Sequence, residues 1–267
     1  MKLRASHILI IGTLIVLGTA VTWFLISNRS RVSTDTRLPS SSAPNPSSLT
    51  ARTSVDSRSY KDVRAEIETA RVSLASRYRR ATTPAQKTEI IAEARNAITR
   101  SIYVDMFPFW YGTPWDFNGT TETPGQGKIA CGYFVSTLLR DSGMKVQRVK
   151  LAQQASENII LSLTTEAHVK RFRRVAISEF VAAVTEWGPG LYVVGLDIHT
   201  GFIVNTGSEV LFIHSSYIEP YSVVRELASE SKILAASQYR VIGKLSADEQ
   251  LMVKWLVGTE IMTKKEL

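Results

Sequence analysis

Residues 127–139 read Gly-Lys-Ile-Ala-Cys-Gly-Tyr-Phe-Val-Ser-Thr-Leu-Leu, a glycine-containing loop that runs into an apolar helical pattern. Phe134 and Leu138 recur at the spacing of one helix face, so the pattern predicts a helix that begins near Cys131 and ends near Gly143. Unpaired N–H groups in a first helical turn stabilise a thiolate, and we therefore expect a lowered pKa for Cys131. A buried structural cysteine fits the local stretch equally well.

The composition limits the class of protein. The chain has 267 residues, 44% of them hydrophobic, which suffices for one medium domain with additional segments. The net charge of +8 suits an acidic partner such as a lipid surface or a wall polymer, but no nucleic-acid-binding motif accompanies it, so we expect no nucleic-acid partner. With one cysteine there is no intramolecular disulfide and no CxxC site, and we expect neither a metal nor another cofactor.

The N-terminal region predicts a membrane anchor. From Ile8 to Ile26 no residue is charged, and such a helix is about 28 Å long, the thickness of a bilayer core. The bulky residues that follow do not suit signal-peptide cleavage. We expect residues 1–27 to be an uncleaved signal anchor in the lipid bilayer, with the short basic N-terminus in the cytoplasm and the rest of the chain extracytoplasmic.

Two segments separate this anchor from the main domain. Residues 28–59 are rich in Ser, Thr and Pro and have little to bury, which predicts a disordered linker. Residues 60–104 carry two apolar helical stripes, and Thr83 with Gln86 forms the pattern of a capping box before the second. We expect a helical hairpin that packs on the following domain or acts as a spacer, with binding to a partner as the alternative.

Residues 107–127 combine large aromatic side chains with Gly and Pro, which is typical of an irregular segment over a core or along a cleft. Because the segment precedes Cys131, we expect Trp110, Tyr111 and Trp115 to form a substrate-binding wall. Core packing is the alternative for each ring.

The rest of the chain alternates helical and strand patterns. We expect helices over 151–163, over 178–187 with Ser178 as the cap, and from a capping box at 246–249 to residue 256. Strands are expected over 169–175 and 238–245.

Residues 191–196, 198–204 and 210–216 are rich in β-branched and aromatic residues and predict an antiparallel sheet. The last two runs form a hairpin that carries His199 and His214. A two-residue loop would place the histidines directly opposite each other, and a four-residue loop would place them on a diagonal of the same face. An odd loop length would separate them onto opposite faces.

A cysteine at a helix start and two histidines on a neighbouring sheet suit nucleophilic catalysis. Cys131 would be the nucleophile, His199 the general base and His214 the residue that orients His199. Zinc is the competing use of these residue types, but one Cys and two His match structural zinc patterns poorly.

These residues resemble the NlpC/P60 cysteine peptidases of the papain-like superfamily. The resemblance spans about residues 105–245 and is carried by 109–112, by 131–135 with Leu138 and Gly143, by 199–203 and by 212–215. The family usually has Asp-Cys-Ser where this chain has Ala130-Cys131-Gly132, and Phe109 stands where it has a tyrosine.

The resemblance implies a papain-like α+β fold over residues 105–267, with the nucleophile helix packed on a small antiparallel sheet. It also implies a thiol peptidase or amidase that cleaves an amide bond in peptidoglycan stem peptides or another cell-envelope substrate. A catalytically inactive envelope-binding module and an acyltransferase that uses the same residues are the alternative hypotheses.

Overall fold

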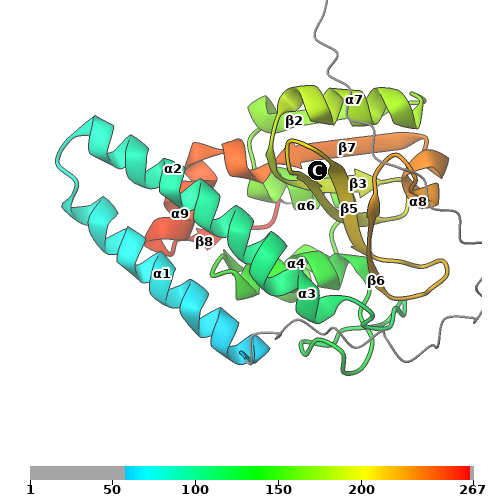
Figure 1. The fold of residues 1–267 in the computed structure, drawn as a ribbon, viewed down its shortest axis with the longest axis horizontal. Coiled ribbons are helices and arrows are strands. Elements are labelled where there is room, and N and C mark those ends of the chain that lie inside the picture. Colours follow the sequence, from blue (N-terminus) through cyan, green and yellow to red (C-terminus); the bar gives the residue numbers. More distant parts are fainter. Residues whose placement is uncertain (1–57, 265–267) are drawn as a thin grey trace, which may run out of the picture. The chain divides into compact units, whose positions relative to one another are not determined.

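A computed structural model describes residues 58–264, which build an α+β fold around a six-stranded antiparallel sheet (Figure 1). The described residues belong to one compact unit. The predicted anchor at 1–27 and nearly all of the linker at 28–59 lie outside the described residues. Among the helices that are described, none combines the length and the apolar character needed to cross a membrane.

The first two helices form the predicted hairpin: α1 (Tyr60–Arg80) and α2 (Pro84–Arg100). The start of α2 is fixed by its capping box. The Gln86 backbone N–H donates to Thr83 Oγ1 at 3.3 Å, and the Thr83 N–H donates to Gln86 Oε1 at 3.2 Å. Both N–H groups would otherwise have no partner at the helix end, so the two side chains define where the helix begins.

The hairpin does not end at residue 104. A π-helical turn, η2 (Ser101–Met106), and the short helix α3 (Phe107–Trp110) continue α2. The predicted boundary at 104/105 therefore falls inside one continuous helical segment. Phe107 and Trp110 are fully buried, so the start of the expected irregular aromatic segment is helical core instead.

The sheet has the strand order β2-β7-β3-β4-β5-β6, and all neighbours are antiparallel. Its strands are β2 (Val169–Arg173), β3 (Gly190–Leu196), β4 (Thr200–Asn205), β5 (Val210–Ser215), β6 (Val223–Leu227) and β7 (Tyr239–Lys244). The predicted strand over 238–245 is thus an interior strand. Strand β6 was not predicted.

The remaining elements complete the fold and differ from the sequence prediction at several points. They are α4 (Cys131–Asp141), β1 (Lys145–Val146), α5 (Arg148–Ala152), α6 (Ser156–Leu163), η3 (Glu166–His168), α7 (Ile177–Trp187), α8 (Lys232–Ala236), η4 (Leu245–Ala247), α9 (Glu249–Val257) and β8 (Glu260–Ile261). The single helix expected over 151–163 is two helices. Ala176 is the N-cap of α7 in place of Ser178, and Asp248 is the N-cap of α9 in place of Ser246.

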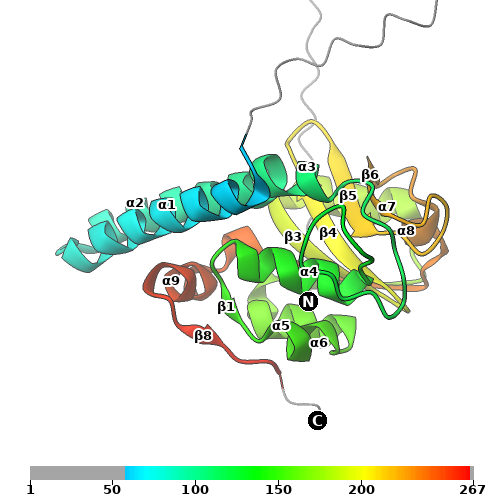
Figure 2. The ribbon, with the colours of Figure 1, turned by 90° about the horizontal axis from the view of Figure 1, so that it is seen from below.

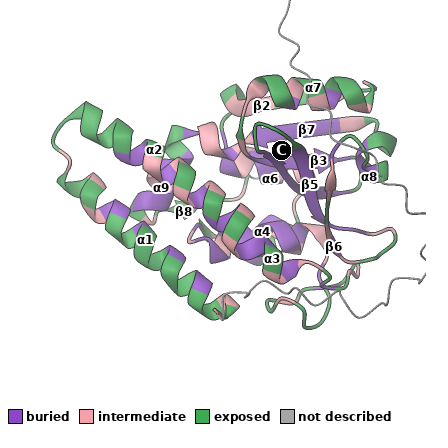
Figure 3. Cartoon of the chain, in the orientation of Figure 1, coloured by how far each residue is buried: buried purple, intermediate pink, exposed green. Residues whose placement is uncertain are grey.

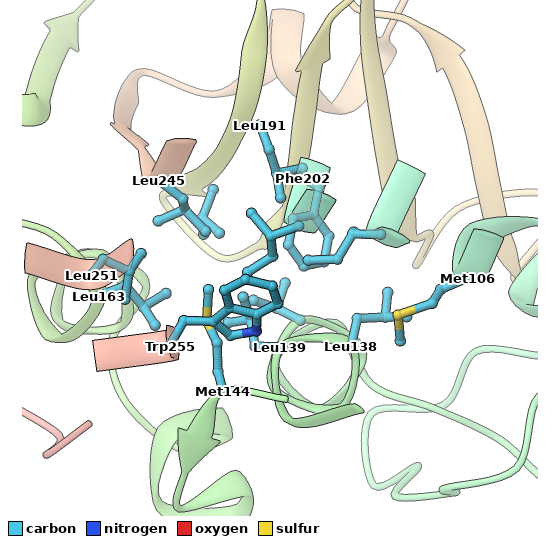
Figure 4. Packing of buried hydrophobic residues seen from close by; sticks show 14 of the residues in the cluster. Met106, Leu138, Leu139, Met144, Leu163, Leu191, Phe202, Leu245, Leu251 and Trp255 are labelled. Carbon is cyan, nitrogen blue, oxygen red and sulfur yellow. The ribbon is translucent and has the colours of Figure 1, made fainter. Parts of the chain in front are cut away.

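Helices cover both faces of the sheet (Figure 2). Helices α4, α6 and α9 and the hairpin pack on one face, where Phe202 and Trp255 belong to the larger core cluster (Figure 4). Helices α7 and α8 cover the other face around Phe180 and Phe212. Because both faces are covered, the central strands are buried almost throughout (Figure 3).

Arg71 ties the hairpin to the C-terminal helix. Its Nη1 donates to the carbonyl oxygens of Trp255 at 3.1 Å and Leu256 at 3.2 Å, which lie in the last turn of α9 and have no partner within the helix. The side chain is buried and also pairs with Glu68. The hairpin is therefore held by polar bonds as well as by shared core.

We expect Arg71→Ala to lower the free energy of unfolding by about 1.5–3 kcal/mol, because two buried carbonyl groups lose a charged donor. Urea denaturation measures the change. Arg77→Ala is the matched control on the same helix, since Arg77 pairs with Glu93 where both side chains are exposed. Equal losses of stability in the two variants would contradict this assignment.

Candidate active site

Cys131 is the first residue of α4, and the helix start leaves backbone donors for its thiol. The N-cap residue, Ala130, offers no side-chain hydrogen bond. The backbone groups of Thr200, of Gly132 and of Cys131 itself act to lower the pKa of the thiol. Thr200 directly follows His199 in the chain. The start of strand β4 therefore brings the predicted base close to the predicted nucleophile.

The histidines come together as expected for a four-residue loop. Asn205 pairs with Val210, which leaves 206–209 as the loop between β4 and β5. This register places His199, just before β4, on a diagonal from His214 in β5. His199 Nε2 and His214 Nδ1 are 2.9 Å apart, and the two rings are nearly perpendicular, with an interplanar angle of 87°.

A third polar group continues this chain. His214 Nε2 lies 3.2 Å from Glu226 Oε1 on β6. Glu226 pairs with Phe212, so it lies on a diagonal from His214 in the same way that His214 lies on a diagonal from His199. Glu226 was not among the predicted site residues, because its strand, β6, was not predicted. The only signal was the short apolar run Val223-Val224 ahead of it.

Burial controls the protonation of these groups. His199 and His214 are 4% and 1% exposed. Burial, together with the neighbouring His214, lowers the pKa of His199 well below 6.5. Burial also lowers the pKa of His214, although Glu226 acts in the opposite direction. Both imidazoles are therefore neutral at pH 7.

The thiol differs from the sequence expectation. Burial raises the pKa of Cys131 above its ordinary value, even though the backbone donors from Thr200 and α4 lower it. The predicted lowering of the Cys131 pKa was wrong, because the burial of the sulfur outweighs the effect of the helix start. At pH 7 the site holds a neutral thiol beside a neutral imidazole.

Cys131 and His199 line the same two pockets. One, of about 660 Å³, is bordered by Trp115, Phe117 and Tyr217. Tyr217 also lies against the ring of His199, with 5.1 Å between centroids. The exposed side chain of Phe117, 79% accessible, stands at its rim. This pocket is the aromatic side of the cleft.

The other pocket, of about 510 Å³, is the more polar of the two. It shares Cys131 and His199 with the aromatic pocket and is lined also by Ser156, Glu157 and Asp197. Cys131 thus lies where two pockets of different character meet. A substrate chain that crosses Cys131 would place one part in each of the two pockets.

Of the three aromatic residues predicted to bind substrate, the structure brings only Trp115 to the cleft. Trp110 is fully buried and packs against Tyr60 and Phe134 in the core. Tyr111 packs at the edge of the same core and lines neither pocket at Cys131. Phe117, Tyr133 and Tyr217 supply the other rings of the wall.

A larger pocket lies away from Cys131. It measures about 740 Å³ and is lined by Arg95, Arg100 and Lys244, with none of the predicted site residues. The Lys244 ammonium group is already bonded to the carbonyl oxygen of Trp187 at 2.6 Å. Across residues 58–264, no three His, Cys, Asp or Glu side chains gather closely enough to hold a metal ion.

Two glycines allow the close packing of the site. A Cβ atom on Gly201 would lie 2.7 Å from Phe212 Cε2 and 2.8 Å from His214 Cβ, so glycine leaves the space in which His214 stands. A Cβ atom on Gly132 would collide with the carbonyl oxygen of Ala152 in α5.

Comparison with models of known protein families gave no match, and neither curated proteins nor solved structures gave one.

We expect Gly132→Ser to lower the free energy of unfolding by about 1–3 kcal/mol, because the new side chain must push α5 away from α4. Thermal denaturation measures the shift. Ala155→Ser introduces the same side chain at the exposed N-cap of α6 and should leave the midpoint unchanged or raise it. An unchanged midpoint for Gly132→Ser would contradict the packing argument.

Proposed function

We propose that the protein is a cysteine hydrolase of the papain-like, NlpC/P60 type that cleaves an amide bond. One observation carries the proposal. Cys131, at a helix start, lines the same cleft as His199, and His199 Nε2 lies 2.9 Å from Nδ1 of a second imidazole, His214. Nucleophile, base and orienting group are the three parts that such catalysis requires.

The contact between the two imidazoles supports a role for each nitrogen of His199. His199 Nε2 is occupied by His214, so Nδ1 is the nitrogen that serves the thiol. As Cys131 Sγ attacks the carbonyl carbon, Nδ1 takes the thiol proton and the carbonyl oxygen becomes an oxyanion, to which the backbone N–H of Cys131 donates. Nδ1 then protonates the leaving amine as the C–N bond breaks, which leaves a thioester.

Water completes the cycle. His199 Nδ1 takes a proton from the water that attacks the thioester carbon, and the C–S bond breaks to release a carboxylic acid and the Cys131 thiol. An amine acceptor in place of water would give acyl transfer with the same residues. Product analysis with and without added amine separates the two reactions.

The resting state suits base-assisted attack better than a preformed ion pair. Burial raises the pKa of Cys131 and lowers the pKa of His199, so the proton stays on sulfur until substrate binds. Proton transfer then accompanies attack on the carbonyl.

The proposed substrate is a peptide of the peptidoglycan stem type or a related cell-envelope peptide. The cleft supports an extended chain, because an aromatic pocket and a polar pocket meet at Cys131. The basic balance of the chain, +8, suits an acidic wall polymer. The anchor expected at 1–27 would hold the domain at the outer surface of a membrane.

We expect Cys131→Ala to abolish cleavage of peptidoglycan stem peptides and His199→Ala to lower kcat by about 10²–10⁴-fold, because the thiol loses its base. Mass spectrometry of the products measures both effects. His168→Ala is the control, since His168 lies outside the cleft. Cleavage by Cys131→Ala at the wild-type rate would overturn the proposal, as would intact substrate after incubation with wild-type protein.

The pH profile tests the resting state. His199 must be unprotonated to act as base, and its pKa lies well below 6.5. We therefore expect kcat/KM to be constant from neutral pH down to 6.5 and to fall only at lower pH, as His199 becomes protonated. Rates measured between about pH 4 and 9 decide this. An acid limb centred at or above 6.5 would contradict the assignment of a neutral, buried base.

A further inference from the structure

We infer that Glu226 determines, through His214, which nitrogen of His199 carries the proton, and is thus a positioning residue for the base. The inference rests on the proposed function for its effect on rate, but not for its effect on protonation. Neither the pattern of histidines nor the resemblance to a family pointed to this carboxylate.

The three side chains form one line across three neighbouring strands. His199 precedes β4, His214 lies on β5 and Glu226 lies on β6, each on a diagonal from the one before. The separations are 2.9 Å between the imidazoles and 3.2 Å from His214 to the carboxylate. Only one hydrogen atom can lie in each gap, so the identity of each donor constrains the next.

The first constraint comes from the carboxylate. Burial raises the pKa of Glu226, but the hydrogen bonds from His214 and Ser231 outweigh this effect, and the pKa stays below its ordinary value. Glu226 is therefore ionised at neutral pH and can only accept. His214 must place its proton on Nε2 and donate to Glu226 Oε1.

The second constraint follows from the first. A neutral His214 with its proton on Nε2 has a bare Nδ1, which can only accept, so His199 must donate from Nε2. His199 is then left with a lone pair on Nδ1, the nitrogen assigned to the thiol. If both hydrogen bonds ran in the opposite direction, His199 would carry a proton on Nδ1 and could not take one from Cys131.

Glu226 is itself held in place. Ser231 is fully buried at the N-cap of α8 and accepts from the Leu234 N–H at 3.2 Å. Its hydroxyl proton is free to donate to Glu226, and its proximity lowers the pKa of that carboxyl group. The acceptor that begins the chain is thus anchored by the polypeptide, although its own side chain is 33% exposed.

The decisive measurement is the tautomer of His199, by long-range ¹H–¹⁵N NMR of the imidazole rings. The chain has four histidines, so single substitutions assign the signals. We compare wild-type protein with Glu226→Gln and Glu226→Ala. Glu230→Gln is the matched control, because Glu230 is exposed and lies four positions further along the chain. Amide hydrolysis is measured on the same samples.

In wild-type protein and Glu230→Gln we expect His199 to carry its proton on Nε2 alone. In Glu226→Gln the amide group can donate to His214, and in Glu226→Ala nothing fixes the direction, so a population with the proton on His199 Nδ1 should appear in both. We expect kcat/KM to fall by about 10- to 1,000-fold, below the roughly 10⁴-fold cost of a wrong tautomer in a serine protease.

A proton on His199 Nδ1 in wild-type protein would overturn the inference, and so would a His199 tautomer that is the same in wild type and both Glu226 variants. These outcomes are independent of hydrolysis. If wild-type protein cleaves no amide, the proposed function fails, while the NMR comparison still decides the role of Glu226.

Discussion

The register between β4 and β5 is the constraint on which the candidate site depends. A slip of one residue in this hairpin would move every side chain of β5 to the opposite face and would separate His214 from His199. The loop that fixes the register is well determined. The Thr206 N–H donates to the carbonyl oxygen of Glu209, and Gly207 adopts a φ of +94°. Asn205 also donates to the carbonyl oxygen of Val184 at 2.9 Å, which ties the turn to α7.

The same burial that protects the imidazole chain also determines the charge of Cys131. A helix N-terminus favours an anion by about 0.3–1 kcal/mol at an exposed site and up to about 2 kcal/mol when partly buried. Removing an ion from water costs several kcal/mol even after the protein relaxes. Burial therefore prevails at Cys131 and keeps the proton on sulfur. The two neutral histidines obey the same balance, because each would have to carry its charge in a nearly closed space.

What the sequence could predict depended on how local the deciding contacts are. The capping box of Thr83 and Gln86 and the hairpin of β4 and β5 join residues close in the chain, and both were predicted. Trp110 and Trp115 look alike in sequence, but Trp110 packs against Tyr60 and Phe134, and only tertiary packing separates a core ring from a cleft ring. Glu226 was missed because strand β6, which carries it, was not recognised.

The helix caps show a subtler limit of local patterns. Ser246 and Asp248 are both good N-cap residues, and sequence favoured Ser246. In the structure Ser246 accepts from the Leu191 N–H across the sheet, while Asp248 caps α9 and also accepts from Thr164 and Thr165. Contacts with strand β3 and with the end of helix α6 therefore determine which of the two residues caps α9.

In the stretch Ala130-Cys131-Gly132, steric contact explains why the residue after Cys131 is glycine. The carbonyl oxygen of Ala152 occupies the space that a side chain at position 132 would need, so α5 can approach α4 only because that residue is glycine. Ala152 in turn borders both pockets at Cys131. A serine at 132 would move this boundary away from the sulfur. Gly132 therefore shapes the cleft, because its lack of a side chain determines how closely α5 approaches Cys131.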